Sequence, residues 1–397
     1  MGTNIGSIKA KLYLGEIEIS GGGGGISGGY NVSFSVNGTI TKIVSVTAGD
    51  SIACNPFEPQ ISGKAFTGWY SGSTKINFPY TPSGDVTLIA GLVEAETCTI
   101  SGLGSSSPSS VIFTKSSGWS DTYETIEKAG DTFKKFPTMW RKVNTTASNQ
   151  ITSITIATAQ IDSSYEVYPC FLAEDGTTVL PYVLMGVSCS NANNTCNSIA
   201  GYTGSVSVLI GTGRTNARNR GTGYQIMDWM IFKLWQDLLI CAMETINTNS
   251  GSGITTDALG IYWGSNVPWV DGVARNASAK WVFSYKPTSY VDSPTASTTD
   301  YIQASYSTPT ISSTTSGYNI TKLGYDSSNH FFNYPSESSQ NASYDTYYCD
   351  AFYGSTDGNY PGFSYVGIDD ANDGAFRCNA SGSWTNSFGV RLCYRPL

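Results

Sequence analysis

Residues 221–243, which read GTGYQIMDWMIFKLWQDLLICAM, form the one long stretch of this chain with a helical periodicity. Apolar side chains recur there at the spacing that places them on one face of an α-helix, at Met227, Ile231, Leu234, Leu238 and Cys241. Thr222 and Gln225 are spaced as a capping box, which satisfies backbone N–H groups at a helix start. The sequence therefore predicts a helix over 222–246 that buries this face in a core.

The same stretch is too polar to cross a membrane. A bilayer span needs about 20 mainly apolar residues. Charged or polar side chains interrupt this run at Asp228, Lys233, Gln236 and Asp237. We therefore expect a core helix and no membrane insertion.

The rest of the chain is rich in Ser, Thr, Gly and Asn, and its apolar runs are short. Segments such as ITSITIATAQI and VSVLIG are typical of strands, and a second, short helix is predicted near 121–129. The 397 residues leave room for about two or three domains. The predicted fold class is mainly β with one principal helix.

The charge balance excludes some partners. Charged residues make up 13% of the chain, against about 25% in an average globular protein. The net charge is −8 and Lys and Arg do not cluster, so the attraction that nucleic acids require is missing. Residues 1–20 lack the basic start and apolar core of a secretory signal, from which we expect assembly in a bacterial cytoplasm.

The nine cysteines do not read as a metal site. They contain no C-x-x-C pair, and His330 is the only histidine that could join them. We expect buried, reduced thiols and no cofactor, with Cys349, Cys378 and Cys393 the most able to pair.

Residues 1–29 suggest an anchor. KAKLYLGEIEI alternates apolar and polar residues as a strand does, and SGGGGGISGG follows it as a hinge. A short strand before a hinge can add to the sheet edge of a partner, and the alternative is a frayed tail.

Residues 30–93 contain four strand-like runs bounded by turn residues. The segments AFTGWYSG and YTPSGDVTLIAGL resemble the Listeria–Bacteroides repeat, a small β-grasp-like module of bacterial surface proteins. The resemblance implies that Trp69 is the core aromatic residue and that a single copy acts as a spacer. SGLGSSSPSS at 101–110 is typical of a linker and marks a domain boundary, and we expect the linker to occupy 94–110.

Residues 111–397 read as one larger head domain. Its segments follow a characteristic order: FKKFPTMWRKVN, YPCFLAEDGTTVLPYVLMGV, ARNRGTGYQIMDWMIFKLWQDLLI, GIYWGSNVPWVDGV and SGSWTNSFGVRLCYRPL. This order resembles the C-type-lectin-like α+β fold of phage structural proteins, as in the major-tropism-determinant and formylglycine-generating-enzyme families. The resemblance implies that the helix is scaffold and that long loops carry a binding surface.

Two further expectations concern the core of this head domain. Five tryptophans are predicted to be buried: Trp229, Trp235, Trp263, Trp269 and Trp384. Residues 389–394 alternate as a final strand that closes the sheet, with Arg391 either a surface charge or half of a buried pair.

Catalysis is not expected. The segment before the last strand lacks the cysteine pair that formylglycine-generating enzymes use, so their activity is not carried over. His330, the only candidate base for a triad, lies in the polar stretch DSSNHFFNYPS without a nucleophile motif. Paired carboxylates for glycoside hydrolysis remain open, because their spacing is spatial. We therefore expect a protein that is not an enzyme.

One acidic stretch invites a metal interpretation. Oxygen ligands suitable for calcium crowd together at Asp369, Asp370, Asn372 and Asp373. Their spacing matches no EF-hand, and Asp and Asn also gather in turns for backbone reasons. A plain turn is the favoured interpretation and calcium the alternative.

Residues 326–388 are dense in aromatic, amide and hydroxyl side chains, a mixture found in antibody paratopes. We predict a receptor surface, suited to glycan, formed by Tyr344, Tyr347, Phe352, Tyr353, Tyr360 and Phe363. The alternative is an ordered excursion packed by its own aromatic rings.

These features favour a bacteriophage virion fibre or appendage that binds a host-surface glycan or protein. Its virion partners would be reached through the N-terminal peptide, and analogy with other fibres suggests a homotrimer. A purely structural capsid-decorating or baseplate protein is the alternative, and a bacterial surface adhesin is less favoured.

Overall fold

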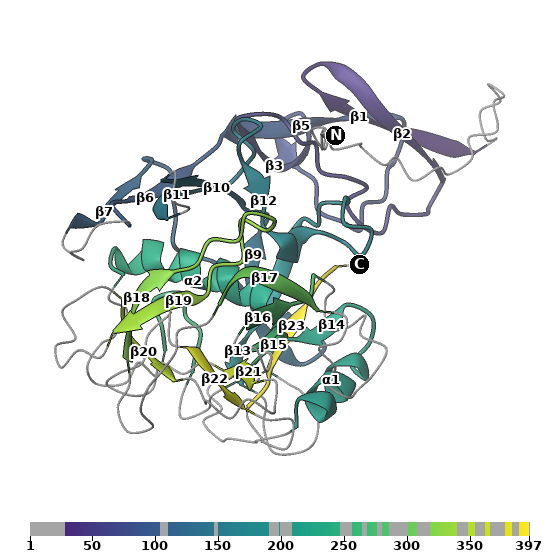
Figure 1. Cartoon of the computed structure of the whole chain (residues 1–397). Helices are drawn as coiled ribbons and strands as arrows, with labels where there is room; N and C mark the ends of the chain where they lie inside the picture. Colours follow the sequence, from purple (N-terminus) through teal and green to yellow (C-terminus); the bar gives the residue numbers. More distant parts are fainter. Residues whose placement is uncertain are drawn as a thin grey trace, which may run out of the picture. The chain divides into compact units, whose positions relative to one another are not determined.

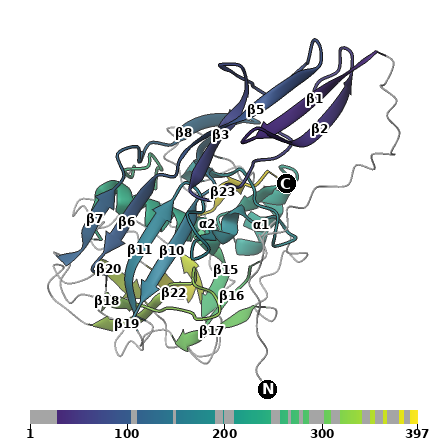
Figure 2. The ribbon, with the colours of Figure 1, turned by 90° about the horizontal axis from the view of Figure 1, so that it is seen from above.

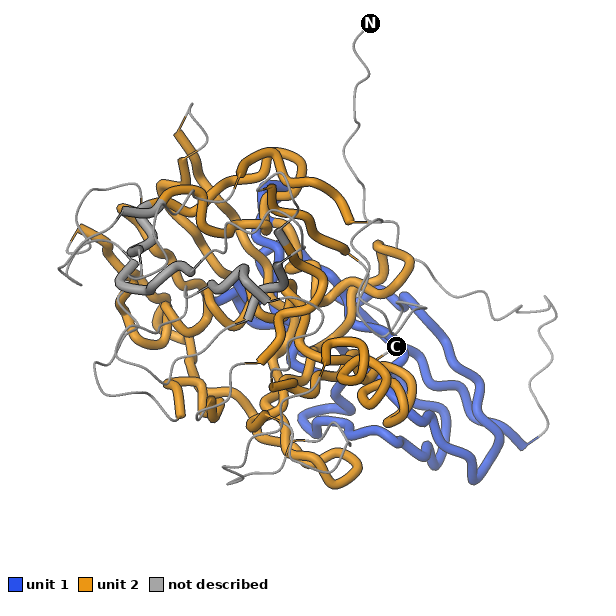
Figure 3. The backbone as a smooth tube through the Cα atoms, turned by 60° about the horizontal axis from the view of Figure 1, so that its bottom comes forward, with its two compact units in different colours: residues 1–96, 157–165 blue, residues 97–156, 166–397 orange. Residues whose placement is uncertain are grey.

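The computed structural model describes residues 28–103, 110–146, 150–189, 198, 209–246, 256–263, 268–275, 280–285, 301–307, 318–339, 348–353, 362–365, 378–382 and 389–396. The chain is mainly β, as predicted, and divides into two compact units (Figure 3). Unit 1 comprises residues 1–96 and 157–165, and unit 2 comprises residues 97–156 and 166–397.

Unit 1 is built on one mixed sheet in which β1 and β5 run parallel and the other neighbours antiparallel. In spatial order its strands are β2 (Thr39–Thr47), β1 (Gly29–Val36), β5 (Val86–Glu94), β3 (Lys64–Ser71) and β4 (Thr74–Lys75). The β1–β2 turn is Asn37-Gly38, with φ of 49° and 81°, the backbone that an Asn-Gly hairpin favours. The β-module predicted over 30–93 is therefore present.

Trp69 is the centre of the unit 1 core, as predicted. Its indole is 1% exposed and its centroid lies 4.8 Å from the Phe34 ring and 5.1 Å from the Phe57 ring. Its Nε1 donates to Asn55 Oδ1 at 2.8 Å, so its polar atom is satisfied within an apolar site.

The described residues of unit 2 form three sheets, whose strands are labelled in Figures 1 and 2. The first has the order β12 (Glu166–Val167), β10 (Trp140–Thr145), β11 (Ile151–Ala157), β6 (Thr97–Ser101) and β7 (Ile112–Lys115). The second has the order β14 (Tyr224–Ile226), β23 (Arg391–Tyr394), β13 (Tyr182–Cys189), β9 (Asp131–Pro137) and β8 (Glu124–Lys128). The third has the order β17 (Ile302–Ser307), β16 (Lys280–Phe283), β15 (Trp269–Arg275), β21 (Gly362–Tyr365), β22 (Cys378–Gly382), β20 (Tyr348–Tyr353), β18 (Tyr318–Leu323) and β19 (Pro335–Ser339).

Two predictions near the start of unit 2 were wrong. The linker predicted over 94–110 overlaps β6, which pairs with β7 and buries Cys98 and Ile100 completely. The helix predicted near 121–129 is β8, which forms a hairpin with β9. The turn residues Ala129 and Gly130 have φ of 51° and 80°, a left-handed conformation that suits a hairpin and ends regular helix.

The principal helix, α2 (Trp229–Met243), begins seven residues later than predicted. Its N-cap is Asp228, whose side chain accepts from the backbone N–H groups of Met230 and Ile231 at 3.1 and 2.9 Å. The capping box at Thr222 and Gln225 was wrong, because residues 224–226 pair with β23 as strand β14. A buried carboxylate at the cap also complements the helix dipole.

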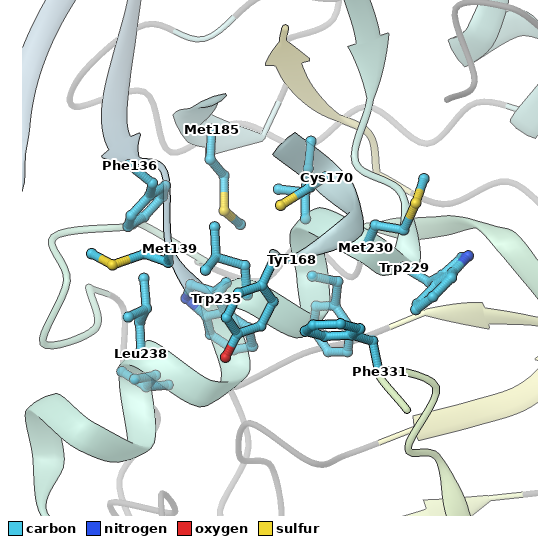
Figure 4. Close-up of a cluster of buried hydrophobic side chains, with 14 of the residues drawn as sticks. Phe136, Met139, Tyr168, Cys170, Met185, Trp229, Met230, Trp235, Leu238 and Phe331 are labelled. Atoms are coloured by element: carbon cyan, nitrogen blue, oxygen red, sulfur yellow. The ribbon is translucent and has the colours of Figure 1, made fainter. Parts of the chain in front are cut away.

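Helix α2 is buried on all sides and not on one face alone. Every residue from Trp229 to Cys241 is buried, including the polar side chains Lys233, Gln236 and Asp237. Figure 4 shows α2 side chains among aromatic and sulfur-containing side chains from other parts of the chain, including Phe136, Met139, Cys170 and Met185. A helix enclosed in this way serves as scaffold.

The shorter helix α1 (Ile210–Arg218) was not predicted, and part of the predicted strand VSVLIG falls on it. Its sequence IGTGRTNAR has two glycines and few apolar residues, so no helical pattern is visible. A 3₁₀-helix at Pro169–Phe171 precedes β13. Neither α-helix of the described residues is long and apolar enough to span a bilayer.

The predicted tryptophan core and final strand are present. Four of the five tryptophans, Trp229, Trp235, Trp263 and Trp269, are fully buried, and Trp384 lies outside the described residues. Strand β23 lies between β14 and β13, so it is an interior strand of its sheet. Arg391 is buried, and its guanidinium donates to the carbonyls of Gly186 and Tyr262 at 2.6 and 2.9 Å.

Five described cysteines are buried free thiols, as expected: Cys98, Cys170, Cys189, Cys241 and Cys393. Cys54 is also free but exposed. Burial raises the pKa of the Cys170 and Cys393 thiols, which keeps them protonated and unreactive. Cys349 and Cys378 lie on β20 and β22.

Candidate functional site

The predicted receptor surface is described in part. Tyr344, Tyr347 and Tyr360 lie outside the described residues. Phe352 and Tyr353 end β20, and Phe363 lies on β21. In the eight-stranded sheet β22 separates these two strands, with Phe352 opposite Cys378 and Phe363 opposite Gly382. The fold thus brings three of the six residues onto two strands of one sheet that β22 separates.

The calcium candidates Asp369, Asp370, Asn372 and Asp373 also lie outside the described residues. Within the described ranges, no group of three or more His, Cys, Asp or Glu side chains is arranged to hold a metal ion.

A cluster of buried charges surrounds Asp237 on α2. Its carboxylate accepts from the Tyr168 hydroxyl at 2.8 Å and lies 3.1 Å from Arg141 Nε and 2.9 Å from Lys233 Nζ. All four side chains are buried. Burial lowers the pKa of Lys233 to about 8, Asp237 opposes that change and Arg141 adds to it. Burial, and then the Asp237 charge, raises the pKa of Tyr168, so its hydroxyl remains a donor.

The turn at 326–333 is held by its own side chains. Asp326, which is 2% exposed, accepts from the backbone N–H groups of Ser328, Asn329 and Ser305 at 2.9, 2.8 and 2.7 Å. Such side-chain-to-backbone bonds fix a turn without regular secondary structure.

Arg141 joins this turn to the cluster around Asp237. Its Nη1 donates to the His330 carbonyl at 3.1 Å and its Nη2 to Asn333 Oδ1 at 2.9 Å. Its guanidinium carbon lies 5.4 Å from the centroid of the Phe331 ring, which packs 5.0 Å from the Tyr168 ring. Figure 4 shows Tyr168 and Phe331 close to each other in the core. The turn is therefore anchored to helix α2 through a buried arginine.

On the surface, this turn presents His330. Its Nδ1 lies 3.2 Å from Glu166 Oε1, and the two side chains are 43% and 50% exposed. The Tyr325 ring stacks on the imidazole with centroids 5.5 Å apart and planes 13° apart. Glu166 is on β12 and pairs with Arg141 of β10. Strand β10 therefore positions both the Glu166 carboxylate and the arginine that holds the turn.

Tyr285 completes the exposed group. It is 40% exposed, and its ring packs edge-on against Trp229 and Phe283 at 6.0 and 5.5 Å. Burial is the main cause that raises the pKa of Tyr285, and the charges of Asp326 and Glu166 raise it further. Burial and the Glu166 charge likewise raise the pKa of Tyr325. We call this group of four residues the aromatic platform: Glu166, Tyr285, Tyr325 and His330.

Sequence reasoning identified His330 only as a possible base and missed its neighbours. The ring contacts of His330 are a carboxylate and a phenol ring, an arrangement suited to holding a ligand. The turn-forming run Asp326-Ser-Ser-Asn329 before a group of aromatic residues was the available signal. Glu166 and Tyr285 are distant in sequence, and only the tertiary structure places them here.

A family model described as the Listeria–Bacteroides repeat domain matches residues 30–91. The match spans the first strand of unit 1 through most of β5. No curated protein matches the chain. Residues 30–91 are therefore a Listeria–Bacteroides repeat module, as their sequence predicted.

Proposed function

We propose that the protein is a bacteriophage virion fibre or appendage whose C-terminal unit binds a glycan on the host surface. The observation that carries this proposal is the aromatic platform, whose rings and carboxylate are exposed or half-buried and lie at a turn that a buried hydrogen-bonded network fixes. Rings held in place lose little conformational entropy when they bind a ligand.

Unit 2 is proposed to have a C-type-lectin-like fold. A buried helix among sheets of short strands supports that assignment. The order of motifs across 136–397 supports it independently, and it is also the basis for the virion assignment. The fold alone does not establish binding, which is argued from the site.

The partners follow from the same proposal. Residues 1–29 would attach the protein to another virion protein by strand addition, and the repeat module would act as a spacer. The net charge of −8 opposes binding to nucleic acid or to an anionic bilayer. A homotrimer would present three heads to one surface, which multiplies a weak glycan affinity.

Two other functions compete with this one. A purely structural decorating or baseplate protein would use unit 2 as a rigid body without a ligand. A bacterial adhesin would use the same surface on a cell instead of a particle.

The double variant Tyr285→Ala/Tyr325→Ala, which removes both phenol rings of the aromatic platform, tests the proposed function. If these rings contact a receptor, adsorption to host cells should weaken by about 1–3 kcal/mol for each ring that is a hot spot, while the melting temperature is retained. The structural alternative predicts the opposite result, since truncating a buried aromatic costs about 3–5 kcal/mol of stability. A stable variant that adsorbs normally would exclude these rings from the receptor surface.

A further inference from the structure

The aromatic platform combines three kinds of group that together suit one class of ligand. Tyr285, which is 40% exposed, and the half-buried Tyr325 offer ring surface. Glu166 offers carboxylate acceptors and His330 offers a ring nitrogen. We propose that the aromatic platform binds a neutral pyranose sugar. This inference rests on the proposed function and names its ligand and contact residues.

Buried hydrogen bonds beneath the platform distinguish it from an ordinary surface patch. Arg141 is 2% exposed, and its two terminal nitrogens hold the turn that carries His330. Asp326 is equally buried, and it holds the same turn by accepting from the backbone N–H groups of Asn329 and Ser305. Burying charged side chains costs solvation energy, so their use to fix the turn that presents His330 indicates that the geometry of the turn matters.

The chemistry of the four side chains matches a sugar ring. The axial C–H groups of a pyranose form an apolar face that packs on an aromatic ring, and its hydroxyls bond to carboxylates and imidazoles. Tyrosine supplies this apolar surface at low entropic cost because it has only two side-chain torsions. The 43–50% exposure of His330 and Glu166 leaves atoms of both residues open to solvent and to a ligand.

Electrostatics select a neutral sugar over an acidic one. Glu166 lies on the platform and Asp326 lies beneath it, and both charges act on the Tyr285 hydroxyl. The whole chain carries a net charge of −8. A sialic or uronic acid would therefore meet like charge at the contact surface, which disfavours it.

The experiment measures sugar binding by the full-length protein. Methyl glycosides of glucose, galactose and N-acetylglucosamine are the probes in saturation-transfer NMR, followed by an array of neutral and acidic oligosaccharides. Tyr325→Leu keeps apolar packing but removes the ring, and Glu166→Gln keeps the shape but removes the charge. Tyr182→Leu on β13 is the matched control, because Tyr182 belongs to another sheet and another hydrophobic cluster.

We expect the wild type to bind at least one neutral probe. Tyr325→Leu should weaken that binding about tenfold, and His330→Ala should weaken it severalfold. Tyr182→Leu should bind like the wild type, and all four variants should retain the melting temperature within a few degrees. Binding that Tyr325→Leu and His330→Ala leave unchanged would overturn the inference, as would a wild type that binds only acidic probes or none.

Host-cell binding by the same variants distinguishes a failure of this inference from a failure of the proposed function on which it rests. If the wild type binds cells and the platform variants bind cells and sugars equally well, the platform is wrong, and the proposed function then rests only on the aromatic residues predicted between Tyr344 and Phe363. If the wild type binds sugars through the platform and binds no host cell, the sugar site stands and the proposed function fails.

Discussion

Replacing Lys233 by methionine should stabilise the protein at neutral pH, although it removes half of a buried ion pair. Lys233 lies within a fully buried group of two cations and one anion, together with Arg141 and Asp237. Removing the lysine leaves Asp237 paired with Arg141 and with the Tyr168 hydroxyl. The variant therefore carries no unpaired charge at this site, and methionine fills a similar volume.

The pKa of Lys233 gives the magnitude. It falls from 10.5 to about 8 because burial disfavours the ammonium more than Asp237 favours it. Each unit of pKa corresponds to about 1.4 kcal/mol, so charged Lys233 costs the folded state on the order of 3 kcal/mol below pH 8. Lys233→Met should recover much of that free energy at pH 7.

The sign of the pH dependence follows from the same comparison. Between pH 8 and 10.5 the unfolded chain holds a proton on Lys233 that the folded chain has released. Stability of the wild type should therefore rise with pH across this window relative to the variant, and the two curves should converge near pH 10.5.

Urea unfolding followed by tryptophan fluorescence, at several pH values from 7 to 10, measures both effects. Asp237→Asn is the opposite control, because it leaves two buried cations without their anion and should cost about 3–5 kcal/mol. A Lys233→Met protein that is less stable than the wild type at pH 7 would refute this reasoning. So would a difference in unfolding free energy between the two proteins that does not change with pH.

Two further predictions follow from the helix and the N-terminus. Asp228→Ala removes the α2 N-cap. It also leaves the buried Arg395, which lies 2.7 Å from the Asp228 carboxylate, without its anionic partner. Thermal unfolding should show that the free energy of unfolding falls by about 3–5 kcal/mol. Asp228→Asn should retain part of the cap contribution, and an alanine variant that melts like the wild type would show that the cap is dispensable. Deleting residues 1–20 should leave a folded protein that no longer assembles into particles, as measured by immunoblotting of purified virions. Normal incorporation of the truncated protein would rule out the anchor.

The features visible in the sequence were those encoded locally. Trp69 and the strand alternation around it identified the first module, and the apolar run of α2 identified the central helix. The start of α2 was misplaced because Thr222 and Gln225 satisfy a local capping rule. In the structure Asp228 caps the helix and also pairs with the buried Arg395. Tertiary pairing of 224–226 with β23 overrode the local signal.

The candidate site depended on contacts that sequence separation hides. Glu166 and His330 are 164 positions apart in the sequence. They lie close together because β12 pairs with β10 and because Arg141 donates a hydrogen bond to the His330 carbonyl. Lys233 and Asp237, by contrast, are one helical turn apart and could be paired from the sequence. Their burial could not, because a polar stripe on a helix is usually solvent-exposed.

Competition between the purified protein and virions for the host surface tests the central claim most directly. Host cells are incubated with increasing concentrations of the full-length protein, and the adsorption rate of particles that carry it is then measured. The wild-type protein should slow adsorption in a saturable manner, and so should the Tyr182→Leu control. Tyr285→Ala/Tyr325→Ala should compete only at concentrations raised by about tenfold or more. An adsorption rate that stays constant at every concentration of the wild-type protein would contradict a receptor-binding role.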